Sequence, residues 1–194
     1  IFWDLKKVYV CNSKMVYKMI KITILLFHIT IIFASSHFNN DISSKYDVEI
    51  LRDSWGVPHI YGTTDEDVAF GFAFAHSEDD FKTIQDVVLQ TRGQLASVYG
   101  VKMAPVDYMT NMLRVRENVE NQYNSLISDD VKGVIEAYVD GLNYYSRLHP
   151  KETVKGLYPI TPEDIVSGFV FRTQFLYGLD YYFNFLYESK NQKN

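Results

Sequence analysis

Cysteine, clustered positive charge and long apolar runs are scarce in this sequence, and each shortage excludes a class of protein. Cys11 is the only cysteine among 194 residues and lies upstream of the expected mature chain, which leaves no disulfide framework and no cysteine nucleophile. The 19 Lys and Arg are outnumbered by 24 Asp and Glu, for a formal net charge of −5. Because phosphate contacts require clustered Lys and Arg, and no basic block is present, we expect no nucleic-acid partner.

The motifs that carry chemistry in several enzyme classes are also missing. No serine lies in a G-x-S-x-G turn, and there is no H-E-x-x-H, EF-hand loop, Walker loop or dinucleotide fingerprint. Ser77 stands between His76 and Glu78, but adjacent residues of a helix point apart, so we interpret them as a polar turn and not a triad. His59 and His149 are interpreted as structural. We therefore expect no catalytic residue in this chain.

A short acidic run and a small-residue pair have structural interpretations as well. Glu78, Asp79 and Asp80 are consecutive, so their side chains diverge, and we expect solvated or helix-capping roles and no metal site. Gly71 and Ala75 are four residues apart, a spacing that favours close packing of a helix.

The N-terminal region has the pattern of an export signal. Residues 1–14 do not resemble folded protein, and we interpret them as an untranslated or disordered leader. Lys18 and Lys21 then precede the apolar run Ile22–Ala34, which small residues follow. This pattern predicts a signal peptide over residues 15–36, from about Met19 to Ser36, and hence a periplasmic or secreted protein.

The same apolar run argues against a stable membrane anchor. It is shorter than the roughly 20 apolar residues of a membrane-spanning helix, and His28 interrupts it. The polar residues 37–45 that follow are predicted to be a flexible mature N-terminus.

The segment 48–62 predicts a β-hairpin. Val48–Leu51 and Val57–Tyr61 have strand-forming residues, and Asp53–Gly56 between them is a turn signal. Pro58 cannot donate a ladder hydrogen bond, so the second strand should begin at it or lie at an edge.

Helices are expected to follow the hairpin. The first begins at a Thr64 cap, breaks near Ser77–Asp80 and ends at Gly93; its buried face is predicted to carry Val68, Phe72, Ala75, Ile84, Val88 and Thr91. Leu95–Tyr99 is expected to be a short helix or a turn. The other predicted helices are Asn111–Asn124, one from Ser128 to about Leu148, and Ile165–Tyr177 after a Thr161–Asp164 start. Val101–Met112 is expected to be irregular, with Pro105 as a breaker, and Lys151–Tyr158 to be a linker loop.

These elements predict a mostly α chain with an N-terminal β-hairpin. A lone hairpin has unpaired edges that need further strands, and the sequence supplies no other candidate strand. We therefore expect residues 46–194 to be an incomplete domain.

Four motifs in order carry a family resemblance. They are V-x-I-x-R-D-x-x-G-V-P-H-I from Val48, G-x-x-x-A-x-x-E-D from Gly71, R-G-x-L-A-x-x-Y-G from Arg92 and A-Y-V-D-G-L-N-Y-Y from Ala137. Together they resemble the start of the penicillin acylase family, whose members include acylases of β-lactams, acyl-homoserine lactones and lipopeptides. The A-H-S-E-D-D-F run is closer to the acyl-homoserine lactone and aculeacin-type branch, and Asp80 stands where the family usually has Arg.

The resemblance implies an α+β fold, part of an αββα N-terminal-nucleophile hydrolase. Such precursors cut themselves into an α chain and a β chain. The new N-terminal Ser of the β chain is the nucleophile, and its own α-amino group is the base. This chain would then be a signal peptide plus an α-chain portion, inactive without its β chain.

The resemblance also implies a substrate and a binding wall. The substrate would be a hydrophobic acyl group in amide linkage to a polar amine, with acyl-homoserine lactones or lipopeptides preferred to β-lactams. The wall would be the helix Thr161–Tyr177, with Phe171, Phe175, Leu176 and Tyr177 as substrate-binding residues. For any single one of them core packing is the favoured interpretation, and we expect one or two of the group to line the pocket. Penicillin G acylases hold a calcium partly through an α-chain Glu, but Leu179–Phe183 offers only Asp180, so we expect no metal and no cofactor.

A different class of function is left open by the residues themselves. The aromatic-rich chain could be a non-catalytic secreted helical module that binds a partner through exposed aromatic side chains.

Overall fold

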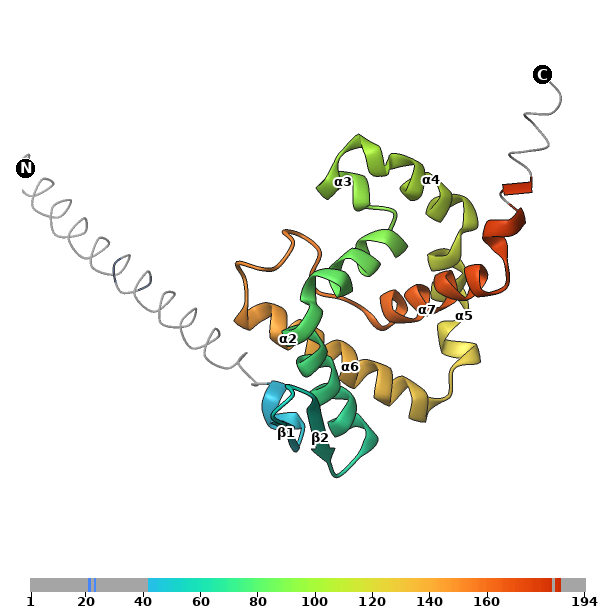
Figure 1. The fold of residues 1–194 in the computed structure, drawn as a ribbon. Helices are drawn as coiled ribbons and strands as arrows, with labels where there is room; N and C mark the ends of the chain where they lie inside the picture. Colours follow the sequence, from blue (N-terminus) through green and yellow to red (C-terminus); the bar gives the residue numbers. More distant parts are fainter. Residues whose placement is uncertain (1–20, 22, 24–41, 183, 186–194) are drawn as a thin grey trace, which may run out of the picture. The chain divides into compact units, whose positions relative to one another are not determined.

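The computed structural model describes Lys21, Thr23, residues 42–182, and residues 184 and 185 (Figure 1). The predicted leader, almost all of the predicted signal peptide and residues 37–41 lie outside the described residues. Residues 42–45 of the predicted flexible N-terminus form the short 3-10 helix η1 (Ile42–Lys45). The chain from Lys45 onward is one compact unit. None of the helices in the described part is both long and apolar enough to cross a membrane.

The predicted hairpin is confirmed. Strands β1 (Val48–Arg52) and β2 (Pro58–Gly62) pair antiparallel, with Val48 opposite Gly62 and Arg52 opposite Pro58. The carboxylate of Asp53 accepts hydrogen bonds from the turn N–H groups of Trp55 and Val57 at 2.8 and 3.0 Å. Gly56 has φ of 82°, which a residue with a Cβ rarely adopts, so glycine closes the turn. Among the described residues, the sheet has only these two strands.

Helix α2 (Asp65–Thr91) begins and bends where the sequence predicts. Thr64 and Asp67 form a capping box, in which each side chain accepts from the other residue's backbone N–H. The helix breaks at Asp80, whose φ of −151° and ψ of 55° are not helical. The Asp80 carboxylate accepts from the N–H of Thr83 at 3.2 Å, so this member of the acidic run has the expected capping role at the second part of the helix.

The predicted buried face of α2 is partly wrong. Ile84 and Val88 are buried as expected, but Val68 is 37% exposed and Phe72 is 50% exposed. The small residues Ala69 and Ala73, one position along, face the core instead. The reason is the packing of α2 against α6 (Asp129–Leu148). Small side chains let the two helix backbones approach closely, and a close approach buries more of the neighbouring helix than a stripe of large residues would allow.

The hairpin packs on the first half of α2 at Gly71. A Cβ built at this position would lie 2.5 Å from Cγ2 of Val48 and 2.9 Å from Cγ2 of Ile60. The interpretation of Gly71 and Ala75 as a close-packing pair is thus confirmed at the glycine.

The stretch 101–126 is more helical than predicted. After α3 (Leu95–Tyr99) come the 3-10 helix η2 (Val101–Met103), α4 (Ala104–Leu113) and α5 (Val115–Leu126). The expected irregular segment is wrong because Pro105 lies in the first turn of α4, where its missing N–H breaks no helical hydrogen bond. Arg114, with φ of 51°, separates α4 from α5, so the predicted helix from Asn111 begins four residues later.

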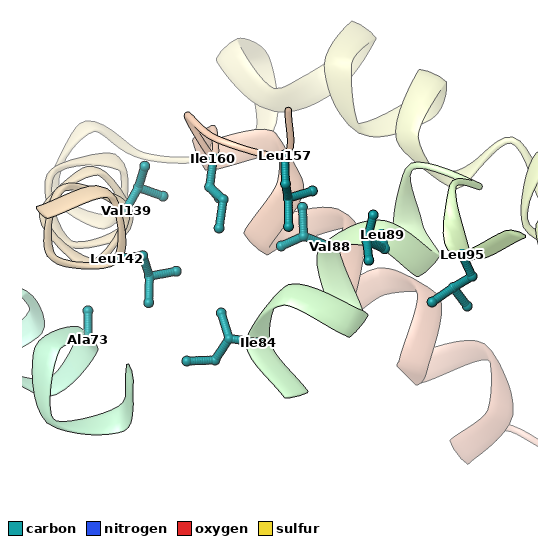
Figure 2. Packing of buried hydrophobic residues seen from close by; sticks show 9 residues of the cluster. All are labelled: Ala73, Ile84, Val88, Leu89, Leu95, Val139, Leu142, Leu157 and Ile160. Atoms are coloured by element: carbon teal, nitrogen blue, oxygen red, sulfur yellow. The ribbon is translucent and has the colours of Figure 1, made fainter. Parts of the chain in front are cut away.

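Helix α6 (Asp129–Leu148) packs along α2, and α7 (Pro162–Leu176) completes the helical unit (Figure 1). Figure 2 shows the main core, which draws on α2, α3, α6 and the loop before α7. Its buried members are Ala73, Ile84, Val88, Leu89, Leu95, Val139, Leu142, Leu157 and Ile160.

The predicted linker between α6 and α7 is a loop, and it is fixed to the core. Leu157 and Ile160 are each 2% exposed. The side chain of Asn143 bonds both the N–H and the carbonyl of Ile160, at 2.8 and 2.9 Å. Gln85 of α2 bonds the Glu152 carbonyl and the Val154 N–H at 3.1 and 2.7 Å. The loop therefore sets where α7 begins.

Candidate functional site

Helix α7 is held in place by a buried carboxylate at its first turn. Asp164 is fully buried and accepts hydrogen bonds from Nε of Arg92 at 2.8 Å and from the N–H of Thr161 at 2.8 Å. Arg116 of α5 forms a second ion pair with it. Burial opposes the charge of Asp164, but these hydrogen bonds and the two arginines outweigh it and hold the pKa of the carboxyl below its usual range.

Helix α7 is buried on one side only. Asp164, Ser167 and Phe171 are buried. Phe169, Leu176 and Tyr177 are 77%, 75% and 83% exposed. The helix is therefore not a core helix, and its apolar residues line surface hollows.

One hollow of about 450 Å³ lies between the second half of α2 and α7, and we call it the Phe171 hollow. Three of the four predicted substrate-binding residues line it: Phe171, Phe175 and Leu176. The rings of Phe171 and Phe175 are 5.2 Å apart. Phe171 also packs against Val115 and Val119, so it serves the core as well. Tyr177 does not line this hollow.

A second hollow of about 310 Å³, which we call the His76 hollow, continues along the same two helices. It shares Val87, Gly168 and Arg172 with the first. His76 and Tyr138 line it, and Nδ1 of His76 and the hydroxyl of Tyr138 share a hydrogen bond of 2.9 Å. Burial raises the pKa of Tyr138 to about 12, so this hydroxyl stays protonated near neutral pH.

Comparison with known protein families decides which family the chain belongs to. Residues 47–179 match the family model described as penicillin amidase. The chain belongs to the penicillin amidase family. The four motifs recognised in the sequence lie within the matched residues.

Curated relatives of this member of the penicillin amidase family include acylases whose names give different substrates. The penicillin acylase 2 proenzyme of Pseudomonas sp. (strain SE83) is 26% identical over 98 residues, which are 50% of this chain and 12% of that protein. The acyl-homoserine lactone acylase QuiP of Pseudomonas syringae pv. tomato has the same identity and coverage. The penicillin G acylase of Escherichia coli is 24% identical over 100 residues, 52% of this chain and 12% of its own length. The matched part thus spans about an eighth of these relatives.

The solved penicillin G acylase of Alcaligenes faecalis has a similar fold. It superposes with a TM-score of 0.55 at 24% identity, and the match covers 64% of this chain and 70% of that chain. The observed mostly α fragment with its strand pair therefore corresponds to part of a penicillin acylase fold, as the sequence predicts.

The residues considered for catalysis in the sequence are separated in the structure. Oγ of Ser77 donates to the Ala73 carbonyl at 2.8 Å within α2, while His76 bonds Tyr138. His59 contacts Asp53 at 3.4 Å in the hairpin, and His149 contacts the Tyr145 carbonyl at 3.1 Å at the end of α6. No triad forms among these four described residues.

Two carboxylates of the acidic run form ion pairs with an arginine of the hairpin. Arg52 of β1 lies 2.8 Å from Glu78 and 3.0 Å from Asp79, so a positive charge of the hairpin offsets negative charge on α2. Throughout the part of the chain that the structure describes, no group of three or more His, Cys, Asp and Glu could hold a metal ion.

Sequence reasoning missed two features of the hollows. The His76–Tyr138 pair joins residues 62 positions apart, and no local signal connects them. Arg172 lies four residues after Gly168, a helical spacing that places both on one face of α7, so this pair could have been found.

Proposed function

We propose that this chain is the α-chain portion of a secreted amidohydrolase. The enzyme hydrolyses a linear amide that joins a hydrophobic acyl group to a polar amine. The observation that carries the proposal is the apolar Phe171 hollow on α7, in a chain whose residues 47–179 match the penicillin amidase family. In this proposal, Phe175 and Leu176 line the acyl site, Phe171 supports it from the core, and Tyr177 faces the partner chain.

The proposal assigns the nucleophile, an N-terminal Ser, to a separate β chain. The fraction of each relative that the match covers supports a separate β chain. The match covers 12% of a protein named as a proenzyme but 70% of one chain of a solved acylase. The two-stranded sheet of the described residues has open edges, which further strands of a β chain would pair. The exposed Leu176 and Tyr177 at the end of α7 would be covered by the same partner.

The proposed acyl group is a long aliphatic chain, as in acyl-homoserine lactones or lipopeptides. The Phe171 hollow supports this choice because Val87, Phe171, Phe175 and Leu176 give it an apolar wall. Asp80, which differs from the usual family residue, caps the second part of α2, so it has a structural role at the helix break.

The test uses the full-length reading frame that contains this chain. We expect two chains after purification, a Ser at the N-terminus of the second, and release of free homoserine lactone from a long-chain N-acyl-homoserine lactone. Replacing that Ser by Ala should abolish both self-cleavage and hydrolysis. An uncleaved protein that hydrolyses no acyl amide would refute the proposal.

Leu176→Ala should weaken binding of long acyl amides by removing part of the hollow's wall. The expected result is a rise in KM on the order of tenfold with a small change in kcat, since one or two methylene contacts are lost. Leu126→Ala is the matched control, because Leu126 is 73% exposed on α5 and lies outside the Phe171 hollow. Equal effects of the two variants on KM would count against the proposed acyl site.

A non-catalytic binding module is the second candidate, favoured by exposed aromatic side chains. Trp55 and Phe169 are 89% and 77% exposed. A full-length protein without amide hydrolysis, in which Trp55→Ala abolishes binding of a partner, would select this alternative.

A further inference from the structure

Arg172 lies where the two hollows meet. It lines both of them, together with Gly168 of α7 and Val87 of α2. A Cβ built on Gly168 would lie 3.1 Å from Cγ1 of Val87, so α7 and α2 approach each other closely at Gly168. The two hollows therefore adjoin at Arg172, the one arginine among the described residues that line them, and together we call them the groove.

The charge of Arg172 is unpaired among the residues that the structure describes. It has no hydrogen bond, ion pair or aromatic contact with them, although it stands beside apolar surface. The other arginines in this part of the chain have partners: Arg52 binds Glu78, Arg92 and Arg116 bind Asp164, Arg114 binds Glu117, and Arg147 lies over the ring of Tyr144.

We propose that the groove binds an amphipathic monocarboxylate. Its carboxylate pairs with Arg172, and its apolar tail lies in the Phe171 hollow. A guanidinium matches a carboxylate with two parallel N–H donors, which gives both charge and geometric selectivity. The hollow's volume of about 450 Å³ lies within the usual range of small-molecule sites.

The remaining polar groups favour this orientation. Asp164 lines the His76 hollow and does not line the Phe171 hollow. Negative charge at that end repels a carboxylate, although Arg92 and Arg116 neutralise most of the effect of Asp164. The described residues that line the Phe171 hollow include no acidic side chain, so an anion held by Arg172 meets no repulsion from its walls.

The acid released by the amide hydrolysis proposed above is an amphipathic monocarboxylate. The groove would then hold the acyl product, and this link alone rests on the proposed function. Binding of a carboxylate can be measured without turnover, so the two proposals can fail separately.

The experiment compares decanoate with decanol by isothermal titration calorimetry on the purified full-length protein. Neither probe contains an amide, so hydrolysis does not contribute to the signal. We expect decanoate to bind more tightly, and Arg172→Gln to weaken decanoate by about tenfold while leaving decanol unchanged. Arg172→Lys should restore part of the loss. Arg147→Gln is the matched control, because Arg147 lies on α6 over Tyr144 and lines neither hollow.

A second variant tests the tail's position. Gly168→Leu should fill the groove and weaken both probes, with folding verified by circular dichroism. The inference is overturned if decanoate binds no better than decanol, or if neither probe binds. It is also overturned if Arg172→Gln leaves decanoate affinity intact, or changes chain assembly in gel filtration without changing the preference between the probes.

Discussion

Asp164→Asn is expected to lower the free energy of unfolding by about 3 kcal/mol, as is typical when one partner of a buried ion pair is removed. The carboxylate of Asp164 is fully buried between Arg92 and Arg116. Without its charge, Arg92 loses its carboxylate partner, while Arg116 keeps its ion pair with Glu120, and the two guanidinium groups still face the same buried site. The amide of Asn can accept fewer hydrogen bonds than a carboxylate, so the capping box with Thr161 is weakened as well.

Urea denaturation followed by circular dichroism measures this effect, and Asp129→Asn is the matched control. Asp129 is also an acid in the first turn of a helix, but its side chain is 98% exposed and pairs only with Lys132. Its replacement should change stability by less than about 0.5 kcal/mol. Similar losses in the two variants would mean that the helix dipole, and not the buried ion pair, explains the result.

The pH dependence separates charge from shape in the Asp164 variant. The pKa of Asp164 is lowered in the folded protein, so its stabilisation is complete above the pKa of an unfolded Asp, about 4. It is lost as the pH falls through the folded pKa. The stability difference between wild type and Asp164→Asn should therefore be constant near pH 7 and shrink below about pH 4. A difference that does not change with pH would show that shape, not charge, is responsible.

Gly141→Ala is expected to destabilise the protein by about 2–3 kcal/mol through overpacking. A Cβ at this position would lie 2.6 Å from the carbonyl oxygen of Phe70 and 2.7 Å from Cβ of Ala73. Neither atom can rotate away, because one belongs to the backbone and the other is fixed to it. The α2 and α6 helices would have to separate, which opens the core around Leu142.

Gly133→Ala on the same helix is the control with the opposite expected sign. Its Cβ would meet only Oε1 of Glu66 at 2.9 Å, and that flexible side chain can move. Since Ala is favoured over Gly within a helix by about 0.5–1 kcal/mol, this variant should be slightly more stable than wild type. Thermal and urea unfolding of both variants test the pair, and equal destabilisation would contradict the close approach at Gly141.

The hairpin, the caps and the family could all be recognised from the sequence because each depends on residues close together in the chain. Thr64 and Asp67 are three residues apart, as are Thr161 and Asp164, and both pairs form the capping boxes that their residue types predict. The break at Asp80 and the start of β2 at Pro58 are equally local. Such features are determined by backbone geometry and nearby hydrogen bonds, whatever the rest of the fold does.

The substrate-binding residues illustrate what a helical pattern leaves undecided. The segment Ile165–Tyr177 is helical and rich in apolar residues, as its sequence indicates. Which of these residues is buried depends on how α7 packs on α2 and α5, and this packing buries Phe171 and leaves Tyr177 exposed. Pro105 is a similar case: proline can end a helix or begin one, and here α4 begins beside it.

The sequence alone determined the local elements of this protein, their order and its membership in the penicillin amidase family. Tertiary structure decided which stripe of α2 is buried, because the close approach at Gly141 favours Ala69 and Ala73 over the larger Val68 and Phe72. It also decided that Arg92 meets Asp164 across 72 positions, while Arg172 has no partner among the described residues. Long-range packing and charge pairing depend on distances that only the folded chain sets, so the sequence places Gly168 and Arg172 on one helix face but does not reveal the groove beside them.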